Sequence, residues 1–163
     1  LVHARKAWLK GLSPKQNREI PELNYDRVYQ LKKDFPHLEI IINGGITSLE
    51  QSTEHLKHLD GVMIGREAYT NPYLLASVDR FIYGSDNPIK TREKVAEEFL
   101  KYVDNELSKG TKLSAMTRHI LGLFHGMPGA RQYRRHISEN AHKPSAGIEV
   151  LSIALAKTSG EKG

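Results

Sequence analysis

Apolar positions in the first half of the chain follow two different spacings. In residues 25–35 they recur every three or four positions, at Val28, Leu31 and Phe35, which predicts an amphipathic helix. Residues 38–42 instead contain three consecutive isoleucines, a β-branched run too short for a helix and typical of a strand buried on both faces. Residues 61–65 form a second short apolar run of this kind. We therefore expect two interior strands separated by helical segments.

The segments between and after these strands read as helices. A helix is expected over about 48–59, with Ser48 or Thr47 as its cap and Leu49, Leu56 and Leu59 on its apolar face. Another helical stretch opens at residues 66–68. Strand and helix alternating at this spacing predict parallel βα units, and hence an α/β fold.

The chain opens inside a short apolar segment, residues 1–5, which breaks into a long polar loop over 6–23. The opening segment reads as a strand. Since natural chains rarely begin within a strand, we expect this one to be part of a larger protein whose N-terminal portion precedes it.

The pattern changes to helices alone from about residue 88. A charged amphipathic helix is predicted over 91–107, with Val95, Phe99, Tyr102 and Val103 on one side. Further helices are expected near 114–123, 130–140 and 147–157. We place a boundary between residues 84 and 90, which gives an α/β portion at 1–86 and an all-helical domain at 87–163.

Composition narrows the possible functions. The 163 residues include 24 Lys and Arg against 19 Asp and Glu, a formal charge of +5, which permits a polyanionic partner. There is no cysteine, so these residues supply no disulfide, thiolate ligand or thiol acid. No apolar run approaches the roughly 20 residues of a membrane span, and we expect a cytoplasmic protein without a metal or a membrane partner. The histidine pairs 55/58 and 119/125 lack a carboxylate or cysteine at ligand spacing.

Two glycine turns follow the apolar strands. They are Asn43-Gly44-Gly45 and Gly65-Arg66. In a parallel barrel, phosphate commonly binds in the loops after the last two strands, where glycine lets the backbone approach and arginine adds a charged donor. A single turn of this kind would favour a plain tight connection. Two turns at this spacing favour a phosphate site.

His3 and Arg5 alternate with Ala4 on the opening strand, so both point to one side. At the carboxyl end of a strand, these two side chains could hydrogen-bond a heterocycle and its phosphate. Surface side chains at a strand end are an equally good account of the spacing.

Basic residues gather in two further places. Lys10, Lys15 and Arg18 lie in the long loop. Arg131, Arg134 and Arg135 share one face of a predicted helix, with Tyr133 beside them, an arrangement that suits phosphodiester contacts and stacking. A merely solvated basic face explains the same pattern equally well.

Four motifs resemble one known family. Residues 2–21, 42–46, 62–69 and 126–134 are all similar to the A subfamily of tRNA-dihydrouridine synthases, and the likeness runs through nearly the whole chain. The long first motif is the most specific, since flavin barrels in general share only the glycine turns.

The resemblance implies an FMN-binding (β/α)8 barrel, of which this chain would hold the last three strands, followed by a helical tRNA-binding domain. His3 would then contact the flavin ring. The FMN phosphate and ribityl end would be held by Asn43, Gly44, Gly45, Gly65 and Arg66. The tRNA would be oriented by Lys15, Arg18, Arg131 and Arg134.

The implied reaction uses NADPH to reduce FMN, which then reduces uridines 20 and 20a of the tRNA D-loop after they have been turned out of the stack. The family also uses a cysteine acid and a lysine from earlier strands. Without them, we expect this chain alone to be inactive. Two alternatives stay open at this point: a noncatalytic RNA-binding module, and another phosphate-binding flavin barrel.

Overall fold

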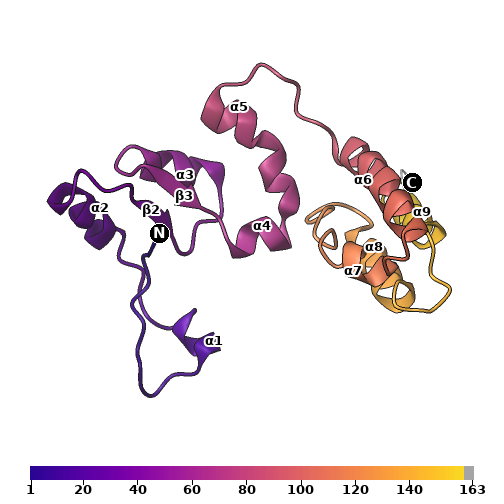
Figure 1. Cartoon of the computed structure of the whole chain (residues 1–163), viewed down its shortest axis with the longest axis horizontal. Coiled ribbons are helices and arrows are strands. Elements are labelled where there is room, and N and C mark those ends of the chain that lie inside the picture. The colour runs from indigo at the N-terminus through magenta and orange to yellow at the C-terminus, as the bar shows by residue number, and fades with distance from the viewer. Residues whose placement is uncertain (160–163) are drawn as a thin grey trace. The chain divides into compact units, whose positions relative to one another are not determined.

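The computed structural model describes residues 1–159, which form two compact units (Figure 1). Unit 1 comprises Leu1–Glu67, and unit 2 begins at Ala68. The helical region expected from residue 87 lies in unit 2 together with the residues that precede it. The division into domains at 1–86 and 87–163 stays a prediction, and each unit is described separately below.

The sheet of unit 1 has three parallel strands in the order β1 (Val2–His3), β2 (Ile41–Asn43) and β3 (Gly61–Met63). β2 is central and pairs with both neighbours. Residues at the carboxyl ends are level, because His3 pairs with Asn43 and Asn43 with Met63. The parallel arrangement expected from the sequence is confirmed.

Two helices connect these strands, α2 (Tyr25–Asp34) and α3 (Leu49–Leu56). Asn24 caps α2, and Ser48 caps α3 by accepting a hydrogen bond from the Gln51 N–H group at 3.2 Å. The apolar side chains between helices and sheet form the core of the unit, which consists of Ala4, Val28, Ile40, Ile42, Ile46 and Leu59.

The central strand begins later than the apolar run predicts. Residues 38–40 are fixed by side chains, since the Lys32 ammonium donates to the Leu38 carbonyl at 2.8 Å and the Ile40 N–H group donates to the Asp60 carboxylate at 2.8 Å. Lys32 and Asp60 also form an ion pair at 2.7 Å. The Ile40 carbonyl accepts from the Asp60 N–H group at 3.1 Å, but regular strand pairing begins only at Ile41, so the expectation of a strand from residue 38 was wrong.

The loop over residues 6–23 contains a short helix, α1 (Pro14–Asn17), that the sequence pattern did not predict. Ser13 and Gln16 form a reciprocal capping box at its start. The Asn17 side chain bonds both backbone groups of Trp8, at 2.8 and 2.9 Å, and closes the loop on itself. Although it lies away from the sheet, this segment has a defined structure (Figure 1).

Unit 2 is helical. The chain enters it through α4 (Arg66–Thr70), which spans the boundary between the units. The elements that follow are a 3-10 helix η1 (Pro72–Ser77), α5 (Val78–Tyr83), α6 (Arg92–Ser108), α7 (Leu113–Thr117), α8 (Ala130–Asn140) and α9 (Glu149–Ser159). Their buried side chains include Val103, Leu113, Phe124, Tyr133, Ile137, Leu151 and Ala154. None of the helices in the described part of the chain is long and apolar enough to cross a membrane.

Two details of unit 2 differ from the sequence prediction. The helix expected over 114–123 ends at Thr117 and gives way to a series of turns. Gly122 lies so close to Thr70 that an added Cβ would be 2.1 Å from the Thr70 carbonyl oxygen. Tyr102, expected on the apolar face of α6, is half exposed, whereas Val103 is fully buried.

Tyr133 is the largest fully buried side chain of unit 2. Its ring packs edge-on against Phe124 with 5.1 Å between centroids, and its hydroxyl donates to the Ile120 carbonyl at 3.2 Å. Burial raises the pKa of this phenol far above its ordinary value. The tyrosine therefore ties α8 to the turns that follow α7.

Tyr133→Phe should lower the free energy of unfolding by about 0.5–1.5 kcal/mol, the net value of one hydrogen bond, because the Ile120 carbonyl keeps the Leu123 N–H group as a donor at 3.0 Å but loses the tyrosine hydroxyl. Tyr102→Phe is the matched control, since its side chain is half exposed. The measurement is urea unfolding of the full-length protein. Equal losses in the two variants would contradict the role of the buried hydroxyl.

Candidate functional site

Polar and glycine residues from separate parts of unit 1 meet at the carboxyl edge of the sheet. His3 and Asn43 are register partners on neighbouring strands. A Cβ added to Gly44 would lie 3.1 Å from the His3 ring, and the atom nearest to a Cβ added at Gly65 is Oδ1 of Asn43, at 4.0 Å. Both glycine turns and the histidine of the opening strand are thus brought together.

The turn after β2 depends on its glycines. Gly44 and Gly45 have φ angles of 121° and 69°, which residues other than glycine rarely adopt. The Tyr25 hydroxyl donates to the Gly44 carbonyl at 2.9 Å, and Leu23 occupies the space in which a Cβ of Gly45 would lie. The turn is therefore held in place by Tyr25, at the start of α2, and by Leu23, just before that helix.

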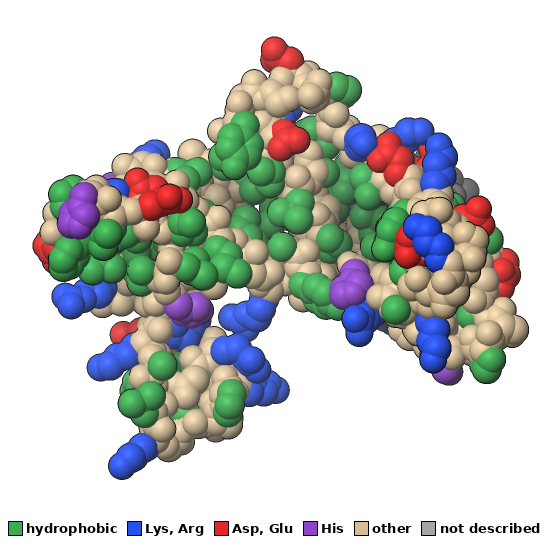
Figure 2. Space-filling view, viewed as in Figure 1, with side chains coloured by type: hydrophobic (Ala, Val, Ile, Leu, Met, Phe, Trp, Pro, Cys, Tyr) green, Lys and Arg blue, Asp and Glu red, His purple; other side chains and the backbone are tan. Residues whose placement is uncertain are grey.

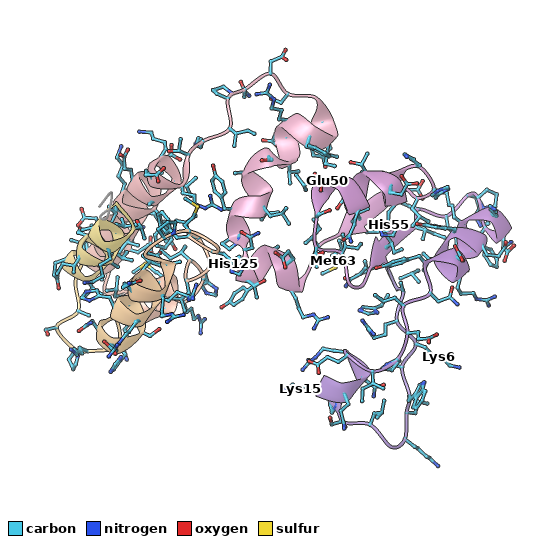
Figure 3. All side chains as sticks on the ribbon, turned by 180° about the vertical axis from the view of Figure 1, so that it is seen from behind. Lys6, Lys15, Glu50, His55, Met63 and His125 are labelled. Carbon is cyan, nitrogen blue, oxygen red and sulfur yellow. The ribbon has the colours of Figure 1, made fainter. Side chains whose placement is uncertain are left out.

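A buried histidine supports this turn from α3. His55 is 5% exposed and its ring packs edge-on against Tyr25, with 4.5 Å between centroids. Its Nδ1 is hydrogen-bonded to the Tyr29 hydroxyl at 2.7 Å. His55 is labelled in Figure 3. Burial lowers the pKa of His55 below its ordinary value, chiefly because the charged form loses its hydration. His55 is therefore a buried, packed histidine.

The two arginines near this edge differ in what they do. The Arg5 guanidinium donates to the carbonyls of Glu19, at 3.2 Å, and Pro21. It closes the base of the 6–23 loop, so the suggestion that Arg5 faces a phosphate is corrected. Arg66 is exposed at the start of α4, directly after Gly65.

This edge fits a phosphorylated ligand. Gly45 and Gly65 are exposed, and a Cβ at Gly65 would meet no atom closer than Asn43, so a ligand can approach the backbone there. Glycine N–H groups and an arginine fork are the donors that phosphate oxygens take in proteins. The chemistry of these residues therefore suits the FMN phosphate.

The 6–23 loop presents a second group of positive charges. Lys15 lies on α1 and Arg18 directly after it, and both side chains are exposed. Figure 2 shows basic side chains gathered on this loop, and Figure 3 labels Lys6 and Lys15 there. Exposed apolar side chains, Trp8 and Leu9, lie in the same loop.

The helical cations separate into two kinds. Arg131 and Arg134 are exposed on α8 and line one cavity. Arg135 instead forms an ion pair with Glu139 at 2.7 Å. Tyr133, expected to stack on RNA beside them, is buried in the core, because a helical position two residues after Arg131 faces the opposite side.

The cavity that Arg131 and Arg134 line lies within unit 2 and has a volume of about 730 Å³. Two further residues line it: Arg118, which the sequence did not single out, and His125, which was considered there only as a metal ligand. Only the motif over 126–134 pointed toward this region. The lining residues are Tyr69, Thr70, Arg118, Leu121, Gly122, His125, Gly126, Met127, Ala130, Arg131 and Arg134.

Residues 1–159 contain no group of three His, Cys, Asp or Glu side chains arranged to hold a metal ion. The described residues do bring together polar and glycine residues at one strand edge of unit 1, and they carry exposed basic side chains in each unit. Parallel strands with their binding residues at the carboxyl edge place unit 1 in the α/β class.

Comparison with known proteins identifies the family. A family model described as dihydrouridine synthase matches residues 1–159, so the chain belongs to the dihydrouridine synthase family. That family has an FMN-binding barrel, and the three parallel strands of unit 1 are consistent with part of one.

Relatives in several bacteria carry the name tRNA-dihydrouridine(20/20a) synthase. The one from Vibrio vulnificus is 68% identical over 156 residues, which cover 96% of this chain and 48% of the relative. The one from Vibrio cholerae is 67% identical over the same shares, and that from Escherichia coli K12 is 61% identical over 95% of this chain and 45% of its own length. The chain spans about half the length of the curated relatives it matches.

Because the folded state favours neutral His55, the protein should lose stability as pH falls. The lowered pKa means that this contribution is fully present above the ordinary value of 6.5 and is lost as pH drops through the lower folded pKa. The measurement is the thermal midpoint of the full-length protein and of His55→Gln, each followed from about pH 7.5 to about pH 5. We expect the wild type to fall more steeply, and parallel curves would contradict the assignment.

Proposed function

We propose that this chain supplies the cofactor-phosphate turns and the RNA-binding cations of a tRNA-dihydrouridine synthase acting on uridines 20 and 20a. The observation that carries the proposal is the meeting of His3, Asn43 and both glycine turns at one strand edge. Identity of 60–68% to relatives bearing that name supports the substrate. The cytoplasm is the proposed location.

The proposed cofactor is FMN. Gly44, Gly45 and Gly65 would offer backbone donors to its phosphate and ribityl end, with Arg66 as the charged partner. His3 would contact the flavin ring. Asn43, which pairs with His3 on the neighbouring strand, would help to hold the phosphate and ribityl end. When bound, this cofactor carries hydride equivalents taken from NADPH to the substrate.

The proposed substrate is tRNA, held in part by two basic surfaces. Lys15 and Arg18 on the 6–23 loop, and Arg131 and Arg134 on α8, would contact backbone phosphates and orient the molecule. Reduction of the uridine 5,6 double bond requires access to the face of the base, so the nucleotide must leave its stack. Cations that hold the flanking backbone serve that requirement.

A noncatalytic RNA-binding module is the second candidate function. The observation that favours it is the basic lining of the unit 2 cavity, which suits RNA binding whether or not the protein is an enzyme. Such a module differs from the enzyme in one measurable property. An RNA-binding module would carry no flavin, whereas the proposed enzyme purifies with flavin absorbance in its full-length form.

Arg66→Ala in the full-length protein should weaken FMN retention by about 1.5–3 kcal/mol, the range for hydrogen bonds to charged groups. Flavin content after gel filtration measures the loss. His3→Ala should instead change the flavin spectrum or its reduction rate more than its retention. Unchanged flavin occupancy in Arg66→Ala would contradict the role of Arg66 at the phosphate. An unchanged spectrum and reduction rate in His3→Ala would contradict contact between His3 and the flavin ring.

Replacing Arg131 and Arg134 together by alanine should weaken tRNA binding while FMN content stays the same. The log-log dependence of affinity on salt should fall by about 0.7–0.9 for each phosphate group that the protein no longer neutralises. Arg135→Ala is the matched control, because it lies on the same helix but is paired with Glu139. Equal affinity and equal slope in the double variant and wild type would refute the role, and joint loss of flavin would show that α8 only supports the fold.

A further inference from the structure

The cavity of unit 2 contains an arginine and a histidine beyond the residues that the family resemblance assigns to tRNA. Arg118 follows α7 directly, and His125 lies in the turns between α7 and α8 (Figure 3). Both side chains are exposed and line the same cavity as Arg131 and Arg134. Four residues from α8, the turns before it and the end of α7 thus line one cavity.

The charge of this cavity is not neutralised from within. Among residues 1–159, three arginines and one histidine line it, and no carboxylate does. The Nε of Arg118 donates to Nε2 of the neighbouring His119 at 3.1 Å, a bond that does not offset its positive charge. Arg135, outside the cavity, shows the contrast through its ion pair with Glu139. Uncompensated guanidinium groups around one hollow favour an anionic ligand.

The backbone that carries these side chains is fixed in advance. Leu123 and Phe124 are buried in the core, and the Arg92 side chain donates to the Leu123 carbonyl at 2.9 Å. Gly122 and Gly129 each lie against a backbone carbonyl, where an added Cβ would be 2.1 Å from the oxygen. Since the backbone of these turns is already ordered, binding a ligand there would cost little further backbone entropy.

We propose that this cavity binds the sugar-phosphate backbone of RNA, with Arg118 and His125 as phosphate contacts alongside Arg131 and Arg134. The proposal rests on the proposed tRNA substrate and adds a concave site to the face of α8. A volume of about 730 Å³ accommodates nucleotide units, and Leu121 and Met127 supply apolar surface for a ribose or base edge. Phosphodiesters match both the charge and the partly apolar lining.

The test is tRNA binding by the full-length protein across a range of salt concentrations. Arg118→Gln should weaken binding about 3- to 10-fold and reduce the salt slope by about 0.7–0.9, whereas Arg135→Gln should do neither. Arg118→Lys, which keeps the charge, should restore most of the affinity. His125→Ala should weaken binding in the same direction. FMN content and the thermal midpoint should match wild type in all four variants.

A double-mutant cycle tests whether the cations share one cavity. Arg118→Gln combined with Arg134→Gln should be non-additive if both contact the same stretch of backbone. If Arg118→Gln and His125→Ala bind like Arg135→Gln while the Arg131/Arg134 variant is weakened, the cavity proposal is overturned and the proposed function stands. If wild-type protein shows no salt-sensitive tRNA binding, the proposed function fails first.

Discussion

Hydrogen bonding of β2 to a parallel strand on each side is the constraint on which the cofactor edge depends. It sets His3, Asn43 and Met63 level with one another, so the turns after β2 and β3 begin at the same height. Ile42, at the middle of the central strand, is completely buried and fixes the register through its packing. A slip of one residue would direct Asn43 to the other face and separate the two glycine turns.

Much of this edge could be predicted from the sequence, because short β-branched runs and glycine turns are local signals. The isoleucines of β2 indicated an interior strand, and the turn at Gly44 and Gly45 indicated an unusual backbone. The start of β2 could not be predicted, since it depends on Lys32 and Asp60, which meet only in the folded chain. The cavity of unit 2 was also missed, because its cations come from separate turns and a helix.

Two polar residues that resembled ligand groups in the sequence serve the protein's own backbone instead. Arg5 donates to carbonyls at the base of the 6–23 loop, and Tyr133 donates to the Ile120 carbonyl inside unit 2. A carbonyl oxygen has two lone pairs and can accept a further hydrogen bond, so a donor side chain that lies near the backbone can bond to it instead of to a ligand. Sequence spacing shows which side chains share a face, but it does not show which backbone groups need a partner.

The closed form of the 6–23 loop also bears on how the protein resists peptidases. Lys10, Lys15 and Arg18 are exposed basic residues of the kind that trypsin cleaves, but cleavage requires several extended residues around the bond. Around Lys15 the capped turn of α1 and the bonds from Asn17 to Trp8 hold the backbone in a folded form. The stretch beside Lys10 and Gly11 carries no such restraint, and nicking of the native loop would therefore begin there.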